Sequence, residues 1–243
     1  VMAVLALVFG QTLSFNWRLH WRFAALGLCI FSGNFALFYH AGNGVASGLL
    51  AVVFSTASLV NVMMVAIIGR ARPPVLHVAA ALIGIGGVTM LYWPELQVSD
   101  TALRSLCFCL FGTLFFCTGN MVSQNCQQHS IPVLASTAWG MLYGTFYLGA
   151  FSLLMGHEFS IEVTTRYVGS LVWLTVVSTV LTFSCYLLLI GRIGASRAGY
   201  ATVVFPVFAL LLSTGFENYH WSMFGMIGLS FVLIGNLIMI RAR

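Results

Sequence analysis

Aromatic side chains at helical spacing are the clearest candidates for ligand contact in this chain of 243 residues. Trp139, Tyr143 and either Phe146 or Tyr147 recur at i, i+4 and i+7 or i+8, so they form one stripe on a helix. Trp139 lies about 10 Å from the start of its apolar segment, which is deeper than the interfacial belt of a membrane helix. The stripe is therefore either a packed or lipid-facing surface, or a stacking wall for an aromatic ligand.

A second candidate group stands at the end of another apolar segment. His40 is preceded by Tyr39, and Asn43 follows three residues later on the same helical face. Imidazole, amide and phenol groups together can hydrogen-bond the ammonium or the carboxylate of a small zwitterion. His40 could equally be a structural histidine whose bonds are satisfied within the fold.

Two further phenols and one proline lie inside apolar segments. Tyr186 and Tyr200 each need a hydrogen-bond partner when buried, and we expect them near the same pocket. Pro206 falls in the middle of its segment, where it would free a carbonyl and bend the helix. We therefore predict a kink or hinge at Pro206.

No residue pattern typical of catalysis, metal binding or cofactor binding is present. The acidic residues lie between the apolar segments, Cys107-x-Cys109 lacks further metal ligands, and Gly84-x-Gly86-Gly87 sits inside an apolar run. Ala80-xxx-Gly84 and Gly140-xxx-Gly144 have the spacing that lets membrane helices approach closely. We expect no enzyme activity, no metal and no cofactor. We also expect no nucleic-acid partner, because the net charge of +5 comes from scattered arginines.

The segments that position these residues have the composition of membrane helices. Hydrophobic residues make up 60% of the chain and charged residues 6%, against roughly 25% charged residues in soluble domains. The apolar runs are continuous and near the length of about 20 residues that a spanning helix needs. The nine predicted spans are 1–15, 23–40, 46–68, 76–93, 103–122, 133–155, 167–190, 196–214 and 222–240.

Charge in the short loops predicts the orientation of the chain. If the spans alternate, eight arginines fall on one side, while the other two share the opposite side with all five acids. The positive-inside rule places the arginine-rich side, and with it the C-terminus, in the cytoplasm. The chain begins with Val1 in a short span, so we expect one upstream span, which gives ten helices. The eight are Arg18, Arg22, Arg70, Arg72, Arg192, Arg197, Arg241 and Arg243.

Two stretches repeat at an offset of about 150 residues. Residues 46–55 (ASGLLAVVFS) align with 197–206 (RAGYATVVFP), and residues 80–87 resemble residues 228–235. Each half then holds five spans, and an odd number inverts the second copy relative to the first. The predicted repeats are 1–97, which lacks its first helix, and 98–243.

This repeated pattern resembles the EamA repeat of the drug/metabolite transporter superfamily. The second copy carries the usual proline (Pro206) and a glutamate in the following loop (Glu217), whereas the first copy has Ser55 and Arg70. The stretch 38–44 (FYHAGNG) and the charge-poor spans look closest to the YddG-type aromatic amino acid exporters. The resemblance implies an all-α bundle of ten membrane helices in two inverted halves, in a bacterial inner membrane.

The function expected from these observations is export of neutral, especially aromatic, amino acids by alternating access. The predicted spans contain no carboxylate, so coupling to protons through a buried acid is disfavoured, and facilitated transport or exchange is expected. We expect a monomer whose partners are the lipid bilayer and its small-molecule substrate. The substrate-contacting residues would be Tyr39, His40, Asn43, Trp139, Tyr143, Tyr186 and Tyr200.

Two other functions fit the sequence. The same fold could export other metabolites or lipophilic cationic drugs, for which the aromatic side chains could form a cage. A membrane-embedded enzyme or a structural scaffold is a third possibility. The missing catalytic carboxylates count against an enzyme, and a scaffold has no need of inverted repeats.

Overall fold

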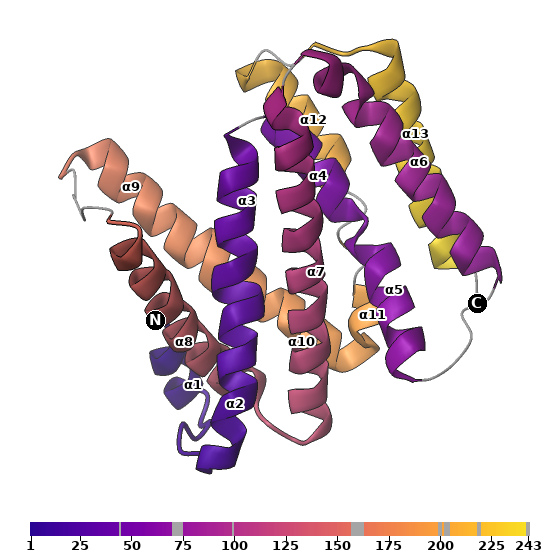
Figure 1. The fold of residues 1–243 in the computed structure, drawn as a ribbon. Coiled ribbons are helices and arrows are strands. Elements are labelled where there is room, and N and C mark those ends of the chain that lie inside the picture. The colour runs from indigo at the N-terminus through magenta and orange to yellow at the C-terminus, as the bar shows by residue number, and fades with distance from the viewer. Residues whose placement is uncertain are drawn as a thin grey trace. The chain divides into compact units, whose positions relative to one another are not determined.

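The computed structural model describes residues 1–43, 45–69, 75–98, 100–156, 163–198, 201, 205–217 and 220–241. All regular structure in these residues is helical (Figure 1), and each of the nine predicted spans contains a helix. The predicted all-helical class is therefore confirmed. By length and composition, five helical stretches among the described residues could cross a membrane, and two shorter helices there are also apolar. They are Trp17–Gly42, Ser47–Ile68, Val75–Pro94, Thr101–Gln128 and Thr165–Ile193, then Phe205–Phe216 and Met223–Ile238.

The helices follow the predicted spans closely, but several are divided. The elements in chain order are α1 (Met2–Val8), α2 (Trp17–Leu26), the π-helix η1 (Gly27–Gly33), α3 (Asn34–Gly42), α4 (Ser47–Ser55), α5 (Ala57–Ile68), α6 (Val75–Val98), α7 (Asp100–Gln128), α8 (Val133–Leu154), α9 (Thr165–Trp173), the π-helix η2 (Leu174–Leu181), α10 (Thr182–Ile193), α11 (Ala195–Ala198), α12 (Phe205–Phe216) and α13 (Met223–Arg241).

The chain divides into two compact units. Unit 1 comprises Val1–Gly33 and Val122–Gly194, and unit 2 comprises Asn34–Met121 and Ala195–Arg243. Each unit takes residues from both sides of position 97. The compact units therefore differ in their bounds from the predicted repeats 1–97 and 98–243, and the division into repeats stays a prediction.

The first predicted span, 1–15, is wrong in its length. Helix α1 ends at Val8, and Gly10 follows with a φ of 69°, a conformation that a glycine adopts without strain. The side chain of Gln11 then accepts a hydrogen bond from the Ala135 N–H at 3.1 Å, in the first turn of α8. Asn16 caps α2 by accepting from the Arg18 N–H at 3.2 Å. Residues 11–16 therefore serve two helix starts and do not extend the first helix.

Glycines set the packing of unit 1, in which α8 lies against α1, α2 and η1. A Cβ atom on Gly27 would lie 2.6 Å from the Gly140 carbonyl oxygen and 2.8 Å from the Gly144 nitrogen. A Cβ atom on Gly144 would lie 2.7 Å from the Cβ of Phe31. The Gly140-xxx-Gly144 spacing thus forms a close helix contact, as the sequence predicted.

Two π-helical segments occupy comparable places in chain order. Helix η1 lies between α2 and α3, and η2 lies between α9 and α10. Hydroxyl groups support these wide turns by donating five residues back: Ser32 to the Gly27 carbonyl, Thr179 to that of Leu174 and Thr182 to that of Val177. Such turns are often found at functional sites.

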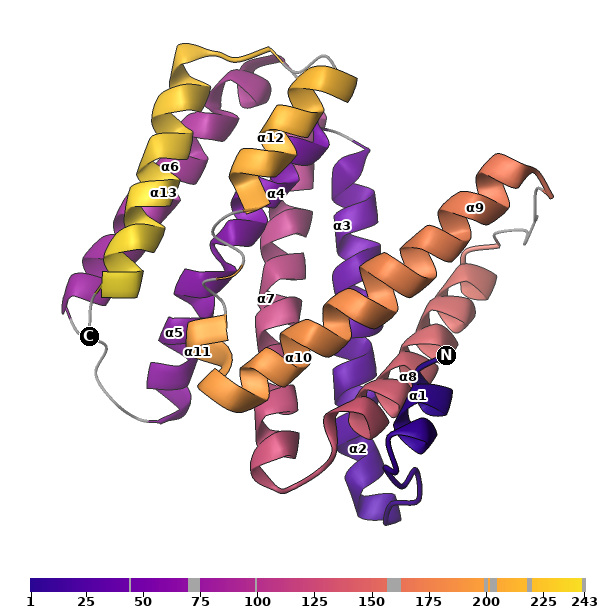
Figure 2. The same ribbon diagram turned by 180° about the vertical axis from the view of Figure 1, so that it is seen from behind.

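In unit 2, helices α6 and α13 form an antiparallel pair, and they run side by side in both Figure 1 and Figure 2. A Cβ atom on Gly87 would lie 2.6 Å from the Gly228 carbonyl oxygen, and one on Gly228 would lie 2.6 Å from that of Gly87. At the other end of the contact, a Cβ atom on Gly235 would lie 2.8 Å from the carbonyl oxygen of Ala80. The two backbones therefore touch with no side chain between them.

These contacts pair positions that the sequence comparison aligned. The alignment equates Ala80 with Gly228 and Gly87 with Gly235; in the structure Gly87 meets Gly228, and Ala80 meets Gly235. This reciprocal pattern is the one that a two-fold relation between two copies produces. The aligned residues Phe54 and Phe205 also meet, with ring centres 6.5 Å apart and planes 5° from parallel.

A carboxylate caps a helix within unit 2. Glu217 follows α12, and its carboxylate accepts from the backbone N–H of Ser47 at 2.9 Å, at the start of α4, and from the Ser213 hydroxyl. The hydroxyl of Ser213 and the donors of Ser47 hold the pKa of Glu217 below its ordinary value of 4.5. This contact links the end of α12 to a helix start about 170 residues earlier in the chain.

We predict that Gly87→Ala destabilises the protein, whereas Gly86→Ala does not. The methyl group at position 87 would overlap the Gly228 carbonyl and force α6 away from α13, at a cost of about 1–3 kcal/mol. Gly86 is the matched control, because its Cβ would meet nothing within 4 Å. Thermal unfolding in detergent measures the difference. Equal melting temperatures for the two variants would contradict the close contact.

We predict that Glu217 makes stability depend on acid. Because its pKa is lowered on folding, its stabilising effect is complete above the ordinary value of 4.5 and disappears as the pH falls through the lower, folded-state pKa. The exposed position limits the effect to less than about 1 kcal/mol. Melting curves between pH 3 and 7 should fall at the acidic end for the unmodified protein and less for Glu217→Gln. Ser213→Ala should move the fall to higher pH; identical curves for all three proteins would exclude this role.

Candidate functional site

The predicted aromatic residues of α8 meet a histidine in unit 1. The ring centre of His20 lies 4.6 Å from that of Trp139, nearly perpendicular to it, and His20 Nδ1 lies 3.0 Å from the Tyr143 hydroxyl oxygen. Phe23 stacks on Trp139 with ring centres 6.5 Å apart, and Tyr143 lies 6.2 Å from Trp139. Trp139 and Tyr143 therefore adjoin, as the helical stripe predicts, and α2 supplies the other half of the cluster.

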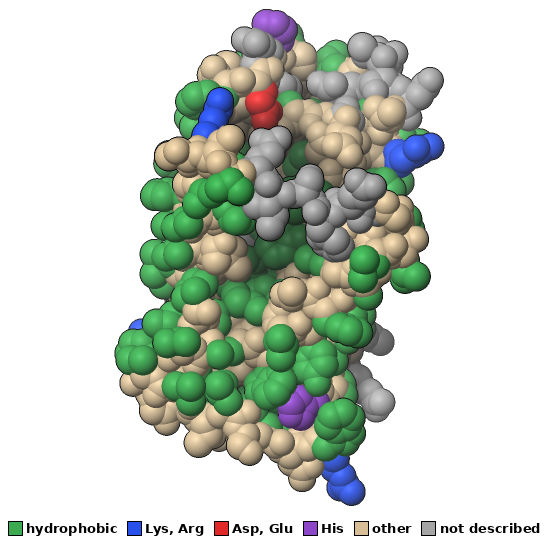
Figure 3. Space-filling view, turned by 90° about the vertical axis from the view of Figure 1, so that its left-hand side faces the viewer, with side chains coloured by type: hydrophobic (Ala, Val, Ile, Leu, Met, Phe, Trp, Pro, Cys, Tyr) green, Lys and Arg blue, Asp and Glu red, His purple; other side chains and the backbone are tan. Residues whose placement is uncertain are grey.

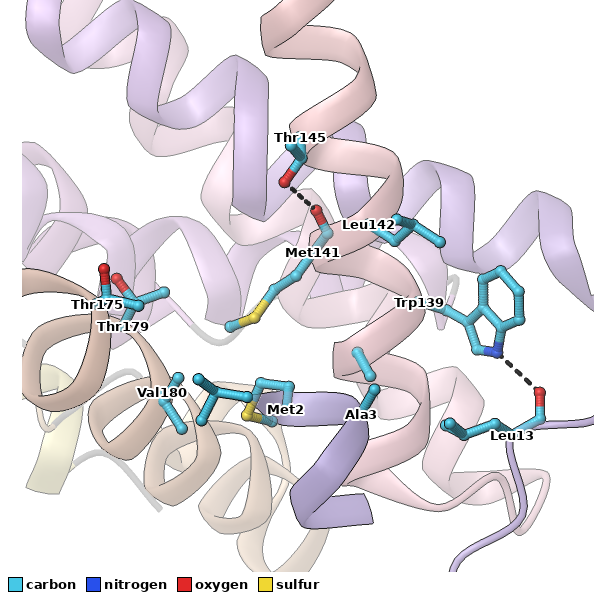
Figure 4. Close-up of a pocket in the computed structure, with 12 residues that line it drawn as sticks. Met2, Ala3, Leu13, Trp139, Met141, Leu142, Thr145, Thr175, Thr179 and Val180 are labelled. Carbon is cyan, nitrogen blue, oxygen red and sulfur yellow. Dashed lines mark hydrogen bonds between the residues drawn. The ribbon is translucent and has the colours of Figure 1, made fainter. Parts of the chain in front are cut away.

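Beside this cluster lies a cavity of about 430 Å³, which falls in the size range of small-molecule sites. Its walls come from α1, α8 and η2, together with Leu13. Figure 4 shows Trp139 on one side of the cavity and Thr175 and Thr179 on the other. The lining residues are Val1, Met2, Ala3, Leu13, Ala138, Trp139, Met141, Leu142, Thr145, Thr175, Thr179 and Val180.

Trp139 offers this cavity its ring and not its N–H group. The indole Nε1 donates to the Leu13 carbonyl oxygen at 3.0 Å, as Figure 4 shows, so its hydrogen-bonding capacity is used within the protein. The bond also fixes the ring orientation, since the other face and edge pack on Phe23 and His20. A held indole of this kind is suited to stacking against an aromatic group or to contact with a cation.

The three threonines of the cavity present acceptor oxygens. Thr145 donates its hydroxyl to the Met141 carbonyl at 2.8 Å, Thr175 to that of Leu171 at 2.7 Å, and Thr179 to that of Leu174 at 2.8 Å. Because each proton is engaged with the backbone, the free lone pairs can accept from a ligand. An ammonium or another N–H donor fits this arrangement.

The polar group predicted around His40 lies in unit 2. Tyr39 is 74% exposed, and His40 and Asn43 are exposed as well. The ring centre of His40 lies 5.9 Å from that of Phe108. None of the three residues lines the cavity of unit 1. Their predicted contact with substrate stays a prediction.

The remaining predicted residues are distributed differently. Tyr186 is half-buried on α10 and is not among the lining residues. Tyr200 lies outside the described residues. Pro206 is buried and is the second residue of α12 as the structure describes it. The kink or hinge at Pro206 remains a prediction.

Sequence reasoning missed His20 and the threonines. His20 precedes the predicted span 23–40, so nothing in the sequence singled it out, whereas in the structure it packs against Trp139. Thr175 and Thr179 carried a usable signal, because their i, i+4 spacing puts them on one helical face. The part played by Met2 and Ala3 could not be read from the sequence, because it depends on α1 packing against α8.

Buried amides of unit 2 connect helices instead of lining this cavity. Asn236 of α13 accepts from the Ser58 hydroxyl, and its amide nitrogen lies 3.5 Å from the oxygen of Ser55. The amide nitrogen of Asn120 on α7 lies 3.5 Å from the amide oxygen of Asn61 on α5.

In the described part of the chain, no three His, Cys, Asp or Glu side chains come close enough to hold a metal ion. Figure 3 shows one face covered largely by hydrophobic side chains with few charged ones.

Comparison with known proteins gives a family and a fold. Residues 103–241 match the model of the EamA-like transporter family, which is more than half of the chain. No curated protein matches the sequence. A solved structure, described only as "Crystal structure of protein", matches with a TM-score of 0.71 and 15% identity, covering 99% of this chain and 83% of its own. At that identity the likeness shows the fold alone.

We predict that Tyr143→Phe destabilises the protein by about 1 kcal/mol, because it removes one partly buried hydrogen bond to His20. Tyr147→Phe is the matched control four residues further along α8, whose ring contacts Phe146. Thermal unfolding should separate the two variants. A melting temperature for Tyr143→Phe equal to that of Tyr147→Phe would mean that the His20 contact adds no stability.

Proposed function

The chain belongs to the EamA-like transporter family and is a multi-pass membrane transporter of small molecules, and we propose that it exports neutral amino acids, with a preference for aromatic side chains. The observation that carries this proposal is the cavity of unit 1, whose lining includes both an indole ring held by a hydrogen bond and threonine acceptors. The aromatic side chain of the substrate would stack on Trp139. Its ammonium group would donate to Thr175 or Thr179.

The carboxylate of such a substrate would remain in water at the mouth of the cavity. The twelve lining residues include no Arg or His, and the cavity is partly open. An anionic substrate would therefore lack a partner in this cavity, which favours a zwitterion bound by its ammonium end. Tyr39, His40, Asn43 and Tyr186 are proposed to contact the substrate at other stages of its passage.

Transport would proceed by alternating access between two inverted repeats, 1–97 and 98–243. The reciprocal contacts of Gly87 with Gly228, and of Ala80 with Gly235, support the repeat, because they relate aligned positions by a two-fold operation. Helix α4 ends at Ser55, the residue that the alignment pairs with Pro206 of α12. Discontinuous helices often mark the moving parts of transporters. We propose facilitated transport or exchange in an inner membrane, with a cytoplasmic C-terminus.

A second cargo is favoured by one observation. The threonines offer acceptors only, and Trp139 offers a ring face, so a lipophilic cation finds all of its contacts in this cavity.

A transport assay separates the two cargoes. Proteoliposomes should be given labelled phenylalanine, threonine, methionine and tetraphenylphosphonium in parallel, with and without a pH gradient. Phenylalanine uptake that ignores the pH gradient supports the amino acid proposal. Uptake of the cation alone, by protein shown to be folded, would replace it.

We predict that Trp139→Leu reduces phenylalanine uptake about three- to tenfold, because it removes the stacking face, while Trp139→Phe keeps most of it. The double variant Thr175→Val and Thr179→Val should weaken binding of any ammonium-bearing substrate by about tenfold, because it removes two acceptors at nearly constant volume.

Thr118→Val is the control for the double variant. The exposed hydroxyl of Thr118 on α7 also donates to its own helix, but it lies outside the cavity. Equal uptake by the double variant and the control would place the substrate elsewhere.

A further inference from the structure

A second cavity in unit 1 differs from the first in having a positively charged side chain in its wall. It measures about 380 Å³ and is lined by Trp17, Arg18, His20, Trp21, Ala24 and Tyr143, so it shares no lining residue with the first cavity. Trp17 and Trp21 are 82% and 64% exposed, so two indole rings border it on the outer side. Where the first cavity lacks a cation, this one carries Arg18 in its wall.

Arg22 follows one turn after Arg18 and adds a second guanidinium beside the residues that line this cavity, although it is not itself a lining residue. Arg18 and Arg22 are four residues apart on α2 and therefore share a helical face. The guanidinium carbon of Arg22 lies 5.8 Å from the ring centre of Trp21, which lines the cavity. Its Nε and Nη1 atoms are enclosed and have no hydrogen-bond partner among the described residues. Enclosed guanidinium nitrogens are costly without an acceptor, which points to an anionic ligand.

Unit 1 itself supplies no counter-ion in its described part. Those residues include Arg18, Arg22, Arg166 and Arg192 but no Asp or Glu. No carboxylate of this part of the chain can therefore neutralise Arg18 or Arg22, and an anionic ligand would supply the missing charge. The exposed indoles require that the same ligand also be compatible with an apolar, membrane-facing border, since Trp side chains prefer the level of the lipid headgroups.

We propose that this cavity binds the phosphate group of an anionic phospholipid, such as phosphatidylglycerol, from the membrane leaflet that the first turns of α2 meet. Arg18 and Arg22 hold the phosphate, and Trp17 and Trp21 flank the glycerol and the start of the acyl chains. Basic pockets at the ends of membrane helices are suited to such headgroups. A zwitterionic phospholipid fits less well, because its own cation would lie beside two arginines. The inference is independent of which substrate the first cavity carries.

Native mass spectrometry and thermal unfolding of the purified protein in detergent test this site. Added phosphatidylglycerol should bind and raise the melting temperature more than phosphatidylcholine does. Arg18→Gln or Arg22→Gln should each weaken phosphatidylglycerol binding by about fivefold, the equivalent of about 1 kcal/mol for one arginine near an anionic surface. Arg22→Lys should retain most of the binding. Arg192→Gln is the matched control, since Arg192 is an exposed arginine of the same unit outside this cavity.

Three results would overturn the proposal. Unchanged lipid binding by Arg18→Gln, which alters an exposed side chain and leaves the fold intact, would exclude the site even if Arg22→Gln fails to fold. An equal loss in Arg192→Gln would mean general attraction of lipids to positive charge. Displacement of the lipid by millimolar inorganic phosphate or by phenylalanine would assign the cavity to a free anion or to the transported substrate.

Discussion

The structure depends on one constraint: in a lipid environment, polar backbone groups must find partners inside the protein. Helices meet this demand locally, which is why all the regular structure in the described part of this apolar chain, with 6% charged residues, is helical. The same demand explains the side-chain hydroxyls. Serines and threonines donate to carbonyls three to five residues back, and in the two π-helices they support carbonyls five residues away. The hydroxyl protons are thus used within the helices, and only the oxygen lone pairs remain for a ligand. The acceptor character of the first cavity follows from this internal pairing.

With hydrogen bonds satisfied within helices, close packing must hold the helices together. Glycines provide it in both units: Gly27 against Gly140 and Gly144 in unit 1, and Gly87 against Gly228 in unit 2. Backbone contact of this kind gains dispersion energy that side chains in lipid cannot gain from burial alone. Polar contacts such as Ser58 with Asn236 then fix which helices pair. In the contact between α6 and α13, Gly87 meets Gly228 and Ala80 meets Gly235. The two helices therefore contribute aligned positions and pack on each other in the same way.

Unit 1 separates two kinds of chemistry over a short distance. Trp139 and His20 are in ring contact, yet Trp139 faces the cavity lined by threonines and apolar residues, while His20 and Tyr143 face the cavity that contains Arg18. The hydrogen bonds of Trp139 to Leu13 and of Tyr143 to His20 hold this layer in place. This arrangement suits a protein that handles a small uncharged or cationic group on one side and contacts an anionic surface on the other.

The sequence by itself determined the helical class, the position of nearly every helix and the family resemblance, because each depends on local composition and periodicity. It also placed Trp139 and Tyr143 on one face, since helical spacing alone decides that. It did not reveal the short α1, which depends on Gln11 and Asn16 serving as caps for other helices. It could not place His20 against Trp139, assign Thr175 and Thr179 to the same cavity as Met2, or show that Nε and Nη1 of Arg22 lack a hydrogen-bond partner among the described residues. Only the tertiary structure decided these points, because each is a contact between helices distant in the chain, and the glycines that let those helices approach impose no local pattern that specifies the partner.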